Sequence, residues 1–285
     1  MGLPKNIHDF DLKSLNFESK ITSKPEKKPQ FSTIYGKGGI GKSSLASYSI
    51  DPIILPIGRE TGHEGMYVPK FPNYEEMGLS IVNHVFACLS WVIKSEHTRK
   101  TLIIDNGGSY REGVDEDVEL SNVGVDLKAF GKGASFAYPY YTRLMATIDE
   151  VMKRRNMNVI LLAHDGAYNV NLPDGTYFQK ISVNMPGGEN TNVRGLIEAR
   201  CHNVFYMVNE SPTMNVKNNF GVTKKIATSG NVSRVVYTKP SGNFFAKSRV
   251  NLDDYYPIGD SGSEEELLKD RTNEDMIRFW DDIYK

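Results

Sequence analysis

An α/β fold with a mostly parallel sheet flanked by helices is predicted from three features of the sequence. Apolar runs of strand length recur, helix-periodic segments separate them, and a glycine-rich loop follows the first run. Runs that are apolar throughout are typical of strands buried on both faces, and helical crossovers between such strands give parallel pairing. The runs are residues 31–35, 53–57, 101–104 and 159–163.

Helices are expected over the segments between these runs. One begins at residue 43, and a second follows Asn73 and Glu76, which resemble a capping box. A third, residues 140–156, ends in three cations, as suits a helix C-terminus. Residues 106–135 read as a long polar loop that includes the acidic segment 111–120, interpreted as a lid or as a surface that faces away from any DNA.

The second half of the chain predicts β-hairpins and a less regular order. Turn residues at 172–176 and at 239–242 each separate two β-prone runs, and a short helix is expected over 192–200. Pro56 in the second apolar run predicts a strand at the edge of the sheet or with a bulge.

Three regions are predicted along the chain. Residues 1–30 read as a flexible tail, or alternatively as a basic arm for a neighbour or nucleic acid. Residues 31–257 form the globular core. Residues 258–285 are acidic and end in an amphipathic helix.

Composition excludes several classes of protein. The net charge of -1 gives no bulk positive field for nucleic acid, so such a site must be a local basic patch. Two cysteines outside any C-x-x-C pair do not predict a disulfide framework. The polar N-terminus lacks a secretory pattern, and no apolar run approaches the roughly 20 residues of a membrane span. A cytoplasmic protein without a membrane partner is expected.

The glycine-rich loop matches the P-loop pattern G-x-x-x-x-G-K-[ST] at every fixed position. Glycines let successive backbone N–H groups point into one concavity that holds phosphate oxygens, and the following helix N-terminus adds partial positive charge. Lys42 is expected to reach the β- and γ-phosphates of ATP, and the Ser43 hydroxyl to ligate Mg²⁺. The residues predicted to bind the nucleotide are Gly36, Lys37, Gly38, Gly39, Ile40, Gly41, Lys42, Ser43 and Ser44.

Acidic and imidazole side chains follow the other apolar runs. Asp105 ends the third run, where it can hold Mg²⁺ through water beside the phosphates. Glu60 follows the second run and is the first choice to orient the attacking water, with Glu64 as a competitor. His164 ends the fourth run, where a neutral imidazole could contact the γ-phosphate or its water; the alternative is a purely structural role.

Together these residues resemble the RecA-type ATPases reduced to their core, specifically the phage group of AAA-like proteins that includes the Sak-type single-strand annealing proteins. The resemblance covers roughly residues 31–257. Beyond the P-loop and the strand-end residues, it rests on residues 236–240, Val-Tyr-Thr-Lys-Pro, and 246–249, Ala-Lys-Ser-Arg. The Lys-x-Arg pair of the last block is the most discriminating feature.

The resemblance implies a slow or DNA-stimulated ATPase that binds single-stranded DNA and promotes annealing or recombination. It also implies self-association into a ring or filament, and a phage single-strand-binding or replication protein as a possible partner. In this pattern Lys247 and Arg249 reach the ATP of a neighbouring subunit and stabilise charge in the transition state. The alternative is a pair of surface cations.

A second resemblance stays open. Lys37 makes the loop also match the deviant P-loop of the ParA, MinD and nitrogenase iron-protein family, which acts as a switch through dimerisation and protein partners. That family should carry a strand-end aspartate shortly after the first helix and an Asp-x-x-Gly switch after the third apolar run. The corresponding stretches here are residues 57–60, Ile-Gly-Arg-Glu, and 105–108, Asp-Asn-Gly-Gly, and the first of them lacks the aspartate.

Cations and rings interleave in the C-terminal third, the mixture that a single-stranded DNA groove needs. Many solvated hairpins share this mixture. The residues are Lys217, Lys224, Lys225, Lys239, Lys247 and Arg249, with Phe220, Tyr237, Phe244 and Phe245.

Overall fold

The computed structural model describes residues 16–21, 27–123, 132–188, 191–210, 213–217, 223–227, 233–258 and 273–285. Most of the predicted tail, the ring of Phe220 and residues 259–272 lie outside these ranges. Within the tail the structure describes one short helix, α2 (Phe17–Lys20). The division of the chain into three regions remains a prediction.

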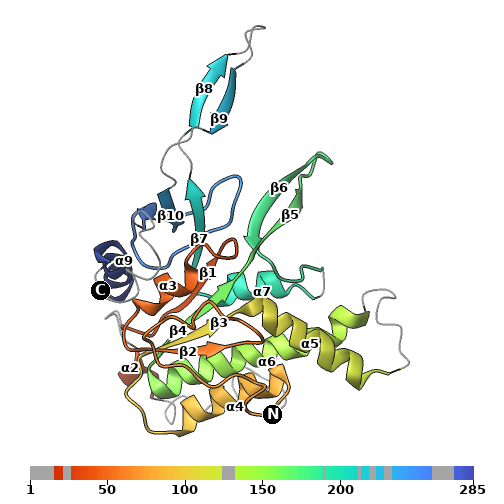
Figure 1. Ribbon diagram of the computed structural model, residues 1–285, viewed down its shortest axis with the longest axis vertical. Coiled ribbons are helices and arrows are strands. Elements are labelled where there is room, and N and C mark those ends of the chain that lie inside the picture. The colour runs from red at the N-terminus through yellow and green to blue at the C-terminus, as the bar shows by residue number, and fades with distance from the viewer. Residues whose placement is uncertain are drawn as a thin grey trace.

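A seven-stranded sheet lies at the centre of the described structure, in the order β11–β10–β7–β1–β4–β3–β2 (Figure 1). The five strands from β7 to β2 are parallel, and β10 pairs antiparallel with both of its neighbours, β7 and β11. The predicted α/β fold is confirmed, and β2 with its Pro56 lies at the end of the strand order, as expected. The strands are β1 (Phe31–Tyr35), β2 (Pro52–Pro56), β3 (Thr101–Asp105), β4 (Asn158–Ala163), β7 (Asn203–Glu210), β10 (Ser233–Tyr237) and β11 (Tyr255–Pro257).

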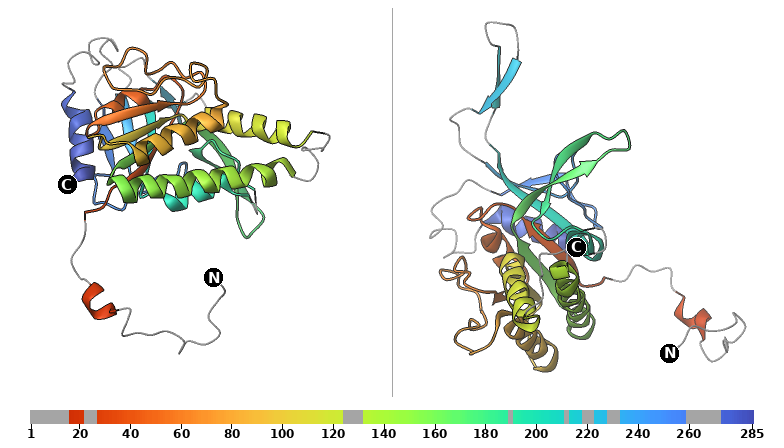
Figure 2. Two further views of the ribbon diagram at one scale, coloured as in Figure 1. Left: turned by 90° about the horizontal axis from the view of Figure 1, so that it is seen from below. Right: turned by 90° about the vertical axis from the view of Figure 1, so that its right-hand side faces the viewer.

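Helices cover both faces of the sheet (Figure 2). One core packs β-strand side chains against α4 (Ile81–Lys94), α5 (Gly107–Ser121), α6 (Lys132–Arg155) and α7 (Val193–Arg200). The other packs against α3 (Lys42–Ser47) and α9 (Glu274–Tyr284). No helix among the described residues is both long and apolar enough to cross a membrane.

The predicted loop over residues 106–135 is wrong for its first half, which is helix α5. Asn106 caps this helix by accepting a hydrogen bond from the Ser109 backbone, and Tyr110, Val114 and Val118 line its buried face at helical spacing. The glycines that indicated a loop have a packing role, because a β-carbon on Gly113 would lie 2.6 Å from the Ile81 side chain of α4.

The predicted boundaries of two other helices also move. The turn at Asn73 does not open α4, which begins after Ser80, whose hydroxyl accepts a hydrogen bond from the Asn83 backbone. Helix α6 begins at Lys132 rather than at residue 140, and it contains Pro139.

Two hairpins project from the sheet (Figure 1). The predicted turn at 172–176 joins β5 (Asp165–Asn171) to β6 (Tyr177–Val183), and β8 (Thr213–Lys217) pairs with β9 (Thr223–Ala227). The hairpin expected around residues 239–242 is wrong. Residues 243–247 instead exchange backbone hydrogen bonds with Ile181 of β6 and Val204 of β7, since β10 has β7 and β11 as its two neighbours.

Parallel pairing sets the position of the functional residues. Tyr35 of β1 lies opposite Ala163 of β4, and Asp105 of β3 lies opposite Leu162. The glycine loop, Asp105 and His164 therefore leave the sheet at one edge, the carboxyl ends of the parallel strands.

Helix α9 is fixed to the core by Trp280, whose indole Nε1 donates a 2.7 Å hydrogen bond to the Leu45 carbonyl of α3. We expect Trp280→Phe to lower the free energy of unfolding by about 1–3 kcal/mol, because it leaves that carbonyl buried without its partner. Ile277→Ala, on the exposed side of the same helix, is the matched control and should change stability by less than about 0.5 kcal/mol. Urea unfolding of both variants measures this, and equal midpoints would contradict it.

Candidate nucleotide-binding site

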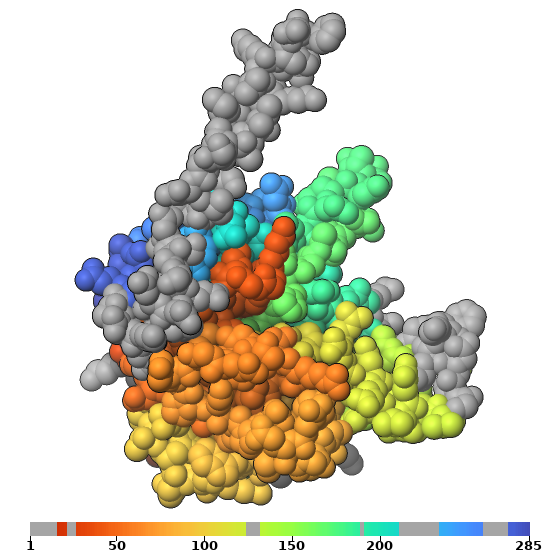
Figure 3. Space-filling view, in the orientation of Figure 1, coloured from red at the N-terminus to blue at the C-terminus, as the bar shows by residue number. Residues whose placement is uncertain are grey.

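The glycine loop between β1 and α3 has a backbone that only glycine fits at two points. A β-carbon on Gly36 would lie 2.2 Å from the Met207 carbonyl oxygen of β7, and Gly41 has a φ of 97°. Ile40 is buried in the core with Leu45, so the loop is anchored from below. Its outer residues, Lys37, Gly38 and Gly39, are exposed, and the loop reaches the surface in red-orange in Figure 3.

Lys42 and Ser43 lie where the P-loop mechanism requires them. Lys42 is only 7% exposed, and its Nζ donates to the carbonyls of Gly36, at 3.0 Å, and Lys37, at 2.8 Å. Burial lowers the pKa of this amine, and the carboxylates of Asp105, Asp165 and Glu60 act against that shift. The amine thus lies inside the loop, the position from which it can exchange carbonyl oxygens for phosphate oxygens.

Asp105 faces Ser43 across the sheet edge. The Ser43 hydroxyl donates a 2.7 Å hydrogen bond to Asp105 Oδ2, and Asp105 is 4% exposed. Burial raises the pKa of Asp105, while the Ser43 hydrogen bond and the Lys42 charge lower it. A hydroxyl and a carboxylate in contact beside a phosphate loop are the oxygen ligands that Mg²⁺ prefers, so these residues fit that ion.

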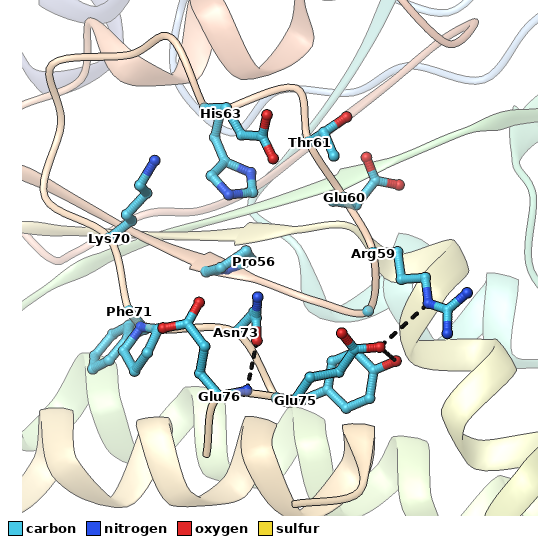
Figure 4. A pocket seen from close by; sticks show the side chains of 14 residues that line it. Pro56, Arg59, Glu60, Thr61, His63, Lys70, Phe71, Asn73, Glu75 and Glu76 are labelled. Atoms are coloured by element: carbon cyan, nitrogen blue, oxygen red, sulfur yellow. Dashed lines mark hydrogen bonds and ion pairs between the residues drawn. The ribbon is translucent and has the colours of Figure 1, made fainter. Parts of the chain in front are cut away.

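Glu60 shares a cavity with the P-loop, whereas Glu64 does not. A cavity of about 250 Å³ is lined by the loop, Glu60, Asp105, Asn106 and His164. A second hollow of about 590 Å³ adjoins it, lies between residues 56–64 and 70–76, and is shown in Figure 4. Glu60 lines both, and Glu64 lines only the second.

Asn106 orients Glu60, a role that the sequence analysis missed. Its side-chain amide donates to Glu60 Oε1, while its own Oδ1 accepts from the Ser109 backbone at the start of α5. The residue is buried, so the amide has one fixed position between helix and glutamate. The only local signal in the sequence is an Asx residue that follows a strand-end acid.

His164 also lines the cavity. A β-carbon on Gly38 would lie 3.6 Å from its Cε1, and one on Gly108 would lie 3.6 Å from its Cδ2. The imidazole therefore fits between the P-loop and the first turn of α5, and it acts on Asp105 as a nearby positive charge when protonated.

Lys247 and Arg249 lie at the opposite edge of the sheet from the P-loop. Lys247 pairs with Val204, and the Arg249 backbone donates to Asn203 Oδ1, at the beginning of β7. The two cations consequently cannot reach the nucleotide of their own chain. A role in the site of a neighbouring subunit stays a prediction.

Several of the predicted DNA-binding residues have structural partners. The rings of Tyr237 and Phe244 lie 4.7 Å apart and pack with Phe245 against the core, so they do not offer free faces to bases. Lys239 forms an ion pair with Asp254. Lys217, Lys224 and Lys225 belong to the β8–β9 hairpin.

Comparison with known proteins places the chain in a family. The model of the AAA domain family (AAA_24) matches residues 28–250, which include every residue that lines the cavity. The chain belongs to this family. It is thus an AAA-domain P-loop ATPase, a class that binds nucleotide and typically depends on Mg²⁺.

A solved structure and a search of curated proteins complete the comparison. The crystal structure of the RadB recombinase aligns with a TM-score of 0.40 and 11% identity, over 81% of this chain and 89% of that one. This likeness concerns the fold alone. No curated protein matches the sequence.

We expect Asp105→Asn to separate stability from Mg²⁺ dependence. The raised pKa of Asp105 means that the folded state disfavours its charged carboxylate. The ionised carboxylate therefore lowers the free energy of unfolding at pH values above its folded pKa, and this destabilisation disappears below the ordinary pKa of 3.8, where the group is protonated in both states. At pH 7 and without Mg²⁺ the variant should therefore unfold at no lower urea concentration than the unmodified protein. ATP binding should meanwhile lose its Mg²⁺ dependence. A less stable variant with normal Mg²⁺ dependence would contradict this assignment.

We expect Glu60→Gln to retain ATP binding and to lower kcat at least ~100-fold, because the amide cannot accept a proton from water. Glu64→Gln is the matched control and should hydrolyse ATP normally. Asn106→Ala should lower kcat while the Kd for ATP stays unchanged, since it frees Glu60 without removing it. Steady-state phosphate release and ATP titration measure these values. Normal turnover by Glu60→Gln together with loss in Glu64→Gln would reassign the role.

Proposed function

We propose that this protein is a Mg²⁺-dependent ATPase that binds single-stranded DNA and promotes its annealing or recombination, with activity coupled to self-association. The observation that carries the proposal is the shared sheet edge. The P-loop, Asp105, Glu60 and His164 meet there, and the β5–β6 hairpin leaves the same edge directly after His164.

The hairpins supply features that suit a DNA strand. On β5–β6, Tyr177 and Phe178 are exposed, and the guanidinium of Arg194 from α7 lies 3.6 Å from the ring centroid of Tyr168 on β5. Exposed rings stack with bases in a sequence-tolerant way, and cations follow the phosphates. The second hairpin carries the adjacent lysines Lys224 and Lys225 on β9.

The position of Lys247 and Arg249 supports a head-to-tail arrangement of subunits. Lys247 and Arg249 lie near the amino ends of the parallel strands, whereas the P-loop lies at the carboxyl ends. If the amino-end side of one subunit stacked on the carboxyl-end side of the next, these cations would come close to the neighbouring nucleotide. Hydrolysis would then require assembly. The same proposal includes a role in phage recombination, with a phage single-strand-binding or replication protein as the partner.

A second candidate is a switch ATPase that dimerises on ATP and acts through protein partners without DNA. It is favoured by Lys37, which is exposed at the outer side of the P-loop where another subunit could approach. Here ATP-dependent dimerisation should be lost in Lys37→Ala, which size-exclusion chromatography with ATP measures.

Binding of a fluorescent single-stranded oligonucleotide, with and without ATP and Mg²⁺, tests the proposal. We expect tighter binding with ATP and an affinity that falls steeply with salt. Lys224→Glu with Lys225→Glu should flatten the salt dependence, because fewer phosphates are neutralised. Lys153→Glu with Arg154→Glu, exposed at the far end of α6, is the matched control. ATP binding without any oligonucleotide binding would exclude the DNA function and leave the switch.

A further inference from the structure

Arg234 of β10 is a buried cation that the P-loop pattern does not include. The residue is only 8% exposed, and its Nε and Nη2 have no hydrogen-bond partner among the residues that the structure describes. Burial of an unpaired charge is strongly unfavourable unless an opposite charge binds it. The guanidinium therefore calls for an anion that is not among its described neighbours.

The guanidinium lies against the P-loop. A β-carbon on Gly41 would lie 2.6 Å from Arg234 Nη1, and the Met207 side chain is the other neighbour at this point. Gly41 also lines the cavity that holds Lys42 and Asp105. The cation is thus adjacent to the phosphate-binding backbone, on the side toward which a β-carbon at residue 41 would point.

Sheet order indicates which end of a nucleotide Arg234 would meet. Asp105 and Glu60 come from β3 and from the loop after β2, so the γ-phosphate end faces that side of β1. Arg234 comes from β10, on the opposite side of β1 beyond β7. The nucleoside end of the ligand must leave toward this side.

We propose that Arg234 binds the α-phosphate of the nucleotide and so complements Lys42, which acts on the β- and γ-phosphates. The inference rests on the proposed ATP-binding function. A planar guanidinium presents paired N–H donors that match phosphate oxygens, and a charged oxygen compensates a buried cation better than the neutral ribose or base. The absence of a side chain at Gly41 is what lets the guanidinium lie directly against the loop.

The test compares Arg234→Gln with the unmodified protein in binding Mg²⁺ with ATP, ADP or inorganic tripolyphosphate, measured by calorimetry. Tripolyphosphate retains a phosphate at the α position but lacks the nucleoside. We expect all three affinities to fall by a similar factor, roughly tenfold to a hundredfold. The ligand-free variant should unfold at no lower temperature, since an unpaired buried charge has been removed. Arg154→Gln, an exposed arginine of α6, should bind all three normally.

Each other outcome has a definite meaning. Unchanged affinities overturn the inference, and a loss for ATP and ADP without a loss for tripolyphosphate overturns it in favour of a nucleoside contact. If Arg234→Gln does not fold, Arg234→Lys retains the charge but not the fork, and normal affinity of that variant for all three ligands overturns the proposal. Absence of ATP binding in the unmodified protein would instead refute the proposed function.

Discussion

The contact between Gly36 and the Met207 carbonyl of β7 is the constraint on which the site depends. The loop turns away from β1 at this point, and a side chain at Gly36 would collide with the neighbouring strand. Because β1 lies between β4 and β7, the loop curls over a fully paired and rigid part of the sheet. This contact fixes where the loop leaves β1, and the parallel register fixes where each strand ends. Together they set the positions of Lys42 and Ser43 relative to Asp105.

Burial of charge is the second property of this edge. Lys42, Asp105 and Arg234 are each less than one tenth exposed, and burial is the largest influence on the pKa of both Lys42 and Asp105. It lowers the first and raises the second, so each group is held in an environment that disfavours its charged form. A ligand that brings phosphate and Mg²⁺ reverses this imbalance, which favours strong coupling between ligand binding and the stability of the fold.

The sequence alone predicted those parts of the site whose residues are close together in the chain or directly follow a strand. The P-loop motif and the apolar runs ending in Asp105 and His164 predicted the strands, their parallel order and the shared edge. Helix α5 was missed because Gly107, Gly108 and Gly113 read as loop residues. Each is closely packed, since a β-carbon would lie 2.5 Å from Met185 at Gly107, 3.0 Å from Asn106 at Gly108 and 2.6 Å from Ile81 at Gly113. Asn106 and Arg234 could not be found from spacing, because their roles depend on contacts with Glu60 and Gly41, which are distant in the chain.

The connection between the cavity and the hairpins follows from the chain itself. His164 lies beside Gly38 of the P-loop and Gly108 of α5, and the next residue, Asp165, begins β5. The His164 carbonyl also accepts a hydrogen bond from Asn184, just after β6, so both strands of the hairpin are attached at this residue. A phosphate that moved the backbone of His164 as well as its imidazole would therefore also move the base of the β5–β6 hairpin. Lys247 and Arg249 lie at the other edge of the sheet and cannot take part in this local movement. In the proposed assembly, the response of the hairpin to nucleotide and the response of hydrolysis to subunit contact would depend on opposite ends of the parallel strands, so variants at His164 and Arg249 would affect them separately.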